Sequence, residues 1–181
     1  HPPKMAVPRR TLLRLPTLLA PALIGVAAAQ ILRALGGDTA SQEGTAMRYV
    51  LIVLALAGNV GAIANTIVVR GLATQEIEHG RLLRPFVGEF LVGLGVAAIC
   101  AFTTWLGIGL IEGSFTNIAA VVGIALLVAV TFSAVMGFCI PLVCESIGID
   151  PALAGPIVIA LNDLAGTSVY VGICLTLLPA P

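Results

Sequence analysis

Five long apolar segments, separated by short polar stretches, make up almost the whole of this chain. They cover about residues 12–35, 46–69, 85–111, 115–143 and 151–178. Each is longer than the roughly 20 apolar residues that an α-helix needs to cross a membrane. The pattern predicts an all-α, polytopic membrane protein with five transmembrane helices in residues 11–181, after a tail of residues 1–10. A cleavable signal peptide is the alternative for the first segment, but that segment is long and shows no clear cleavage site.

The composition agrees with a membrane location. The chain is 59% hydrophobic and only 10% charged, with a mean hydropathy of +1.08, whereas soluble domains carry about 25% charged residues. The formal net charge is zero, so no basic surface indicates nucleic-acid binding. The cysteines are scattered through apolar runs, which favours buried thiols over a soft-metal site.

Basic residues are concentrated at alternate ends of the apolar segments. The N-terminal tail and the stretch after the second segment hold most of them: Lys4, Arg9, Arg10, Arg14, Arg70, Arg81 and Arg84. Lysine and arginine accumulate on the cytoplasmic side of membrane proteins. The sequence therefore predicts a cytoplasmic N-terminus and an outside C-terminus. The expected location is a prokaryotic inner or plasma membrane.

Asp163 lies well inside the fifth apolar segment, in the run Asn162-Asp163-Leu164-Ala165-Gly166. An ionised carboxylate in hydrocarbon costs about 3 kcal/mol or more. Membrane proteins therefore keep such a group mainly where it faces water, an opposite charge or a cation. Asp163, with Thr167 four residues further on the same helical face, is the first candidate for an ion site. Glu89, near the start of the third segment, is expected to pair with a basic neighbour or to reach the interface.

The second apolar segment carries a small and polar face. Asn59, Ala62 and Thr66 follow one another at spacings of three and four, and Gly58 and Gly61 leave the backbone thinly covered. A hydrated ion can approach such a face closely. Small residues and amides are also ordinary packing groups between membrane helices, so packing stays open as the alternative.

Two acidic residues precede the fifth segment. Asp150-Pro151 is typical of a helix start, because aspartate caps free N–H groups and proline fits the first turn. With Glu145 it also places two acids at the predicted cytoplasmic end of the fifth segment, where they would concentrate cations. Helix capping and a solvated loop pair are the simpler alternatives.

Oxygen-bearing side chains on these segments favour a hard divalent cation. Magnesium prefers oxygen ligands, gives up water reluctantly, and is commonly held by one or two carboxylates. Asp163 from each of two chains would offer two negative charges around an axis. Asn59, Asn162 and Thr167 are candidates to bind the water shell of the ion.

These motifs resemble the transmembrane domain of the MgtE family of magnesium channels. The resemblance lies in Gly58-Asn59-Val60-Gly61, residues 69–73, Asp150-Pro151-Ala152 and the run around Asp163, in this order and with five spans. It implies a homodimer whose pore is lined by the second and fifth helices of both chains. It also implies that Asp163 holds Mg²⁺ at the pore centre and that Asp150 lies near the cytoplasmic mouth. The pore-lining candidates are Gly58, Ala62, Thr66, Gly166 and Thr167.

Typical members of that family also have a cytoplasmic N-terminal domain and a pair of CBS modules, which close the pore when magnesium is plentiful. Only about ten residues precede the first predicted span here. The expectation is a transmembrane part without these domains, inhibited weakly or not at all by internal magnesium. The family glutamine after the second glycine is also replaced, by Ala62-Ile63.

Two other classes of function remain open. A sodium- or proton-coupled transporter of divalent metals would use Asp163 as its coupling site, and a non-transporting subunit would pair it with an arginine of a partner. No nucleophile–base pair or metal-hydrolase motif is present, so an enzyme is not expected. The expected partners are a second copy of the chain, membrane lipids and divalent metal ions.

Overall fold

The computed structural model describes residues 6–34, 47–77, 82–111 and 117–177. Within these ranges a short 3-10 helix, η3 (Pro151–Leu153), precedes the last of the long helices, which are α1 (Val7–Ala34), α3 (Val50–Ala73), α4 (Leu83–Ile111), α5 (Asn117–Ser146) and α6 (Ala154–Leu177). These 5 helices are long and apolar enough to cross a membrane. The predicted all-α, five-span fold is confirmed.

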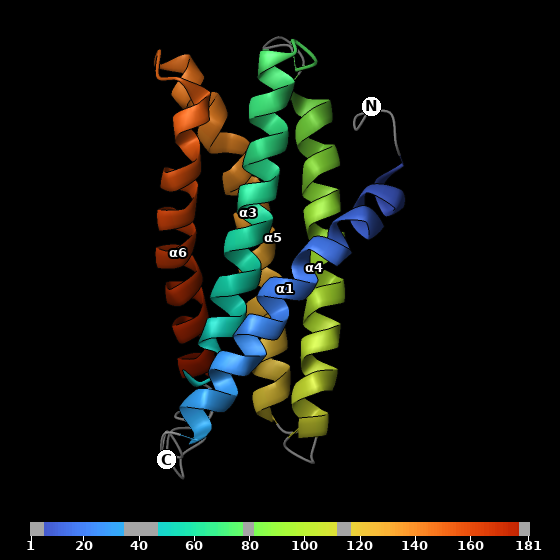
Figure 1. Cartoon of the computed structure of the whole chain (residues 1–181), viewed down its shortest axis with the longest axis vertical. Helices are drawn as coiled ribbons and strands as arrows, with labels where there is room; N and C mark the ends of the chain where they lie inside the picture. The colour runs from blue at the N-terminus through green and yellow to red at the C-terminus, as the bar shows by residue number, and fades with distance from the viewer. Residues whose placement is uncertain (1–5, 35–46, 78–81, 112–116, 178–181) are drawn as a thin grey trace.

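The helices stand side by side, and α1 runs diagonally across α3 and α4 (Figure 1). The most deeply placed helix is α5, which contacts α3, α4 and α6. Its side chains Val122, Leu126 and Val130 are fully buried. By contrast, α6 packs mainly on α3 and α5, and only 28% of its most apolar stretch is buried. Much of the surface of α6 is therefore left for lipid or another protein chain.

Alternate helices run in opposite directions along the long axis (Figure 1). At the top of the view α3 and α5 end, and α4 and η3 begin. Helix α1 begins toward the same end, at the upper right. This end is called the upper end below. The first turn of α1 and the last turn of α6 thus lie at opposite ends of the bundle.

The helix ends differ from the predicted spans. Helix α1 begins at Val7 rather than near residue 12, so Arg9 and Arg10 belong to its first turn rather than to a tail. Helix α3 continues past residue 69 to Ala73, with Arg70 in its last turn, where a cation is favoured by the helix dipole. Basic side chains can extend such helices because their apolar stems lie along the helix while their charges reach the interface or a partner.

A tight turn connects α5 to η3 and α6. Gly148 adopts a φ of +79°, the left-handed conformation that glycine tolerates without strain. The N–H of Ile149 donates to the carbonyl of Cys144 at 2.8 Å, and the N–H of Gly148 donates to that of Glu145 at 3.0 Å. This pattern is a Schellman cap. It ends α5 and directs the chain straight into the start of α6.

Candidate functional site

Asp163 lies on the exposed face of α6, where that helix meets α3. Its Oδ1 atom is 3.9 Å from the position that a Cβ atom on Gly58 would occupy. Within the described ranges, no hydrogen bond or ion pair engages its carboxylate. The negative charge is thus available to an ion or to a group supplied by another chain.

Polar side chains beside Asp163 and further along the same face of α3 each donate a hydrogen bond to their own helix. The Asn59 amide nitrogen donates to the Ala55 carbonyl at 2.8 Å, and Thr66 donates its hydroxyl to Ala62 at 2.8 Å. Thr167 donates to the Asp163 carbonyl at 2.7 Å. Each of these groups therefore keeps oxygen lone pairs for other partners. An acceptor-rich surface of this kind suits a cation or its water shell rather than an anion.

Asn162 lies on a different face from Asp163, although both were predicted to serve the same ion. Its side chain is 1% exposed and packs against Gly61, next to Ser133. Gly166 is also buried, 3.3 Å from a Leu54 methyl group as measured from its ideal Cβ position. These two residues belong to the packed interior, whereas Asp163 and Asn59 are exposed and Thr167 is half-buried.

The two acids before α6 lie at the upper end of the bundle. Asp150 is exposed, and its Oδ1 atom accepts the N–H of Ala152 at 2.9 Å, which is the predicted cap. Glu145 is half-buried in the last turn of α5. The helix cap accounts for the position of Asp150. The carboxylate of Asp150 remains at the surface, with its negative charge exposed.

A single chain does not assemble a multi-acid centre in the part that the structure describes. No three His, Cys, Asp or Glu side chains come together there as a metal-binding group. Cys100, Cys144 and Cys174 are buried free thiols, and Cys139 is half-buried. Asp163 is the one carboxylate carried by α3 and α6 as described.

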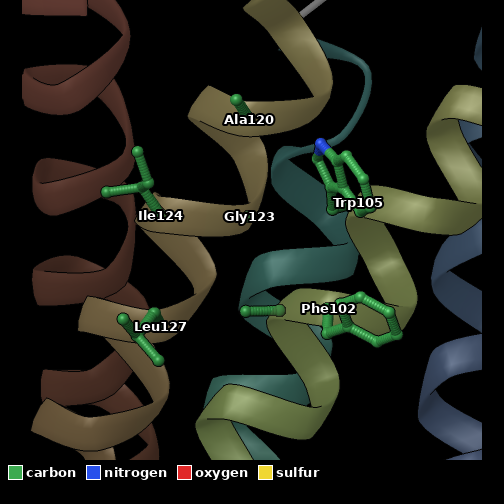
Figure 2. Close-up of a pocket in the computed structure, with 7 residues that line it drawn as sticks. Phe102, Trp105, Ala120, Gly123, Ile124 and Leu127 are labelled. Carbon is green, nitrogen blue, oxygen red and sulfur yellow. The ribbon is translucent and has the colours of Figure 1, made fainter. Parts of the chain in front are cut away.

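A hollow of about 280 Å³ lies between α4 and α5, which are not the helices that form the Asp163 site (Figure 2). Its lining is hydrophobic: Ala101, Phe102, Trp105, Ala120, Gly123, Ile124 and Leu127. Such a surface offers no ligand to a hydrated cation and suits lipid chains.

A buried charge cluster joins α1 to α4. Arg14 donates to both carboxylate oxygens of Glu89, at 2.5 and 3.0 Å, and Arg10 donates to one of them at 2.8 Å. A basic partner for Glu89 was predicted, but no pattern near residue 89 points to α1. The available signal was the spacing of Arg10 and Arg14, which puts both on one helical face.

Residues 50–173 match the MgtE family, described as a divalent cation transporter. The chain belongs to the MgtE family. The matched region runs from the start of α3 into α6 and so includes every residue of the Asp163 site.

Curated relatives in bacteria agree with this assignment. Over 161 residues the chain is 30% identical to the magnesium transporter MgtE of Thermus thermophilus, covering 87% of this chain and 35% of that protein. It is 27% identical over 161 residues to the magnesium transporter MgtE of Enterococcus faecalis, covering 88% of this chain and 35% of that protein. The chain thus spans about a third of the length of these relatives.

Proposed function

We propose that this MgtE-family chain is the ion-conducting part of a Mg²⁺ transporter, with Asp163 binding the hydrated ion between two copies of the chain. The observation that carries the proposal is the state of Asp163. It is an acid well inside a transmembrane helix, exposed, and without a partner among the described side chains. Gly58 beside it has no side chain that would shield the carboxylate.

The chemistry of the surroundings supports magnesium. Mg²⁺ keeps most of its waters and is bound by few carboxylates, which matches one intramembrane aspartate per chain. Asn59 and Thr167 offer oxygen acceptors to water ligands near Asp163, and Thr66 offers another about two turns further along α3. The cysteines are unsuited to this role, since hard cations prefer oxygen over sulfur.

Two copies of the chain balance the charge of the ion. One carboxylate beside a dication leaves a net positive charge in the membrane, whereas two carboxylates related by a two-fold axis neutralise it. The large uncovered surface of α6 is where a second copy would pack. The Asp163 carboxylates of both copies would then face a shared pathway.

The upper end is proposed to face the cytoplasm, with the N-terminus inside and the C-terminus outside. Arg9, Arg10, Arg70 and Arg84 lie in helix turns at this end, in agreement with the cytoplasmic bias of basic residues. Asp150 and Glu145 would then flank the cytoplasmic mouth of the pathway and attract cations to it.

The test is magnesium flux into liposomes containing purified protein. We expect Asp163→Ala to abolish flux and Asp163→Asn to reduce it at least tenfold, because the amide keeps the shape of the side chain and loses its charge. Ser168→Ala is the matched control, since Ser168 is exposed on the same helix and bonds only its own backbone, at Leu164. Wild-type flux in Asp163→Asn would overturn the proposal.

A coupled carrier is the second candidate, because an unpaired intramembrane acid also serves sodium or proton coupling. The same liposomes separate the two cases. Flux that follows the magnesium gradient alone supports a channel, whereas flux that requires an opposing sodium or proton gradient assigns Asp163 to coupling.

A further inference from the structure

Where α3 and α6 meet, an asparagine of each helix packs against a glycine of the other. The amide nitrogen of Asn162, on α6, occupies the space that a Cβ atom on Gly61 of α3 would need. In the reverse direction, the amide nitrogen of Asn65, on α3, is 3.6 Å from the ideal Cβ position of Gly155 on α6. The second contact is ordinary van der Waals packing, whereas the Asn162 amide could not lie where it does if position 61 carried a Cβ atom.

Both asparagines are buried without full hydrogen bonding. Asn162 is 1% exposed and Asn65 is 7% exposed. Neither polar atom of the Asn162 amide, nor the amide oxygen of Asn65, has a hydrogen-bond partner within the part of the chain described. The nearby hydroxyl of Ser133 donates instead to the carbonyl of Ala57. A buried amide without partners opposes folding, and an apolar side chain of the same shape is tolerated better. The stability of the bundle therefore does not explain Asn162.

The position of Asn162 next to Asp163 explains why an asparagine is present there. Consecutive residues on an α-helix point about 100° apart. When Asn162 fills the space over Gly61, Asp163 is turned to the exposed face beside Gly58. A leucine side chain at position 162 would be tolerated equally well facing lipid or facing protein. It would therefore not favour one rotation of α6 about its own axis. An amide is excluded from lipid, and it fits where the facing residue lacks a side chain.

We propose that Asn162 is a positioning residue, which holds α6 in the rotation that presents Asp163 to the ion. This inference rests on the proposed function of Asp163. A single buried asparagine also fixes register in coiled coils, at a cost in stability. Gly61 is the required complement, because a Cβ there would also come within 2.5 Å of the Ser133 hydroxyl oxygen.

The central experiment compares Asn162→Leu with wild type in two measurements. Thermal unfolding in detergent is expected to be unchanged or shifted up by about 2–4 °C, because the unpartnered amide is removed. Magnesium flux over a range of concentrations is expected to show an apparent KM raised about tenfold, with maximal flux largely kept. If only a fraction of the variant molecules holds Asp163 in place, the apparent affinity for magnesium falls in proportion to that fraction. Saturating magnesium then shifts the remaining molecules into the rotation that binds the ion.

The split between KM and maximal flux separates positioning from packing. A lower melting temperature and a lower maximal flux, with wild-type KM, would show that Asn162 only packs the bundle. A wild-type KM with wild-type stability would also overturn the inference. Asp163→Asn is measured in parallel: if it loses flux while Asn162→Leu keeps the wild-type KM, only the positioning role fails. If Asp163→Asn keeps wild-type flux, the proposed function fails first.

A second pair of variants tests the contact itself. Gly61→Ala is expected to lower the melting temperature, because its methyl group collides with the Asn162 amide. Adding Asn162→Ala is expected to recover part of this loss while leaving the KM raised. Gly172→Ala, on α6 with open space around its Cβ position, is the control and is expected to behave as wild type. Equal melting temperatures for Gly61→Ala with and without Asn162→Ala would contradict the contact.

Discussion

Asp150 combines a helix cap with a surface charge, and two substitutions separate these roles. Asparagine caps helices about as well as aspartate does, so Asp150→Asn is expected to keep the bond to the Ala152 N–H and the wild-type melting temperature. If the charge attracts cations to the upper end, magnesium influx at low concentration falls a few-fold in this variant. The effect should fade in high salt, which screens exposed charges.

Asp150→Ala completes the comparison. It removes the cap as well as the charge, so it is expected to lose about 1 kcal/mol of stability in addition to the flux defect. Wild-type flux in Asp150→Asn at low ionic strength would show that Asp150 acts only as a cap.

At the scale of the elements, α1 is attached to α4 by the cluster of Arg10, Arg14 and Glu89. Glu89 is 3% exposed and Arg14 is 7% exposed. Removing one partner of a buried ion pair leaves an uncompensated charge and costs about 3–5 kcal/mol. Glu89→Gln is therefore expected to lower the melting temperature strongly. Arg10→Gln is expected to do so much less, because its side chain is 15% exposed and makes a single contact with Glu89.

The same variants provide a check on function. The helices α1 and α4 do not carry Asp163, so the folded fraction of Glu89→Gln is expected to keep the wild-type KM for magnesium. Thermal unfolding and flux on one preparation give both quantities. A raised KM without loss of stability would contradict a purely structural role for the cluster.

The number and type of the helices follow from the sequence, because hydrophobic length alone sets how many times the chain can cross a membrane. The helix ends do not follow. Helix α1 extends back over Arg10, beyond the predicted start near residue 12, and Glu89, far away in the sequence, pairs with both Arg10 and Arg14. The spacing of Arg10 and Arg14 indicates a shared helical face, but no local pattern near the N-terminus identifies Glu89 as their partner.

The candidate site was predictable to the level of its helical faces. The spacing of Asp163 and Thr167 indicates a shared face, and the structure leaves both at least partly accessible. The burial of Asn162 was not predictable, because it depends on where α6 meets Gly61 and Ser133. Adjacent polar residues on one helix point in different directions, and only the packing of the neighbouring helices decides which of them faces the interior.

At the scale of the whole molecule, the exposed Asp163 carboxylate and the uncovered face of α6 both require a covering that lipid alone does not provide. Large apolar side chains flank Asp163 on the surface, including Leu161 at 42% and Leu164 at 68% exposed. Lipid covers such side chains well, but it does not tolerate the ionised carboxylate among them. The proposed second copy, packed so that the same patch faces itself across a two-fold axis, would meet both requirements.

A mixing experiment tests this assembly directly. If two Asp163 side chains share one ion, liposomes reconstituted from a co-expressed equal mixture of wild type and Asp163→Asn contain only about a quarter fully competent dimers, by random pairing of two subunits. Flux is then expected to fall to about a quarter of the wild-type value, well below one half. Mixing with Ser168→Ala is the control and should leave flux unchanged. A fall of flux to only one half would mean that each chain conducts through its own pathway. Active preparations that are monomeric by native mass spectrometry would lead to the same conclusion. The steeper fall requires that neither Asp163 binds the ion alone, because one carboxylate leaves the dication uncompensated within the membrane.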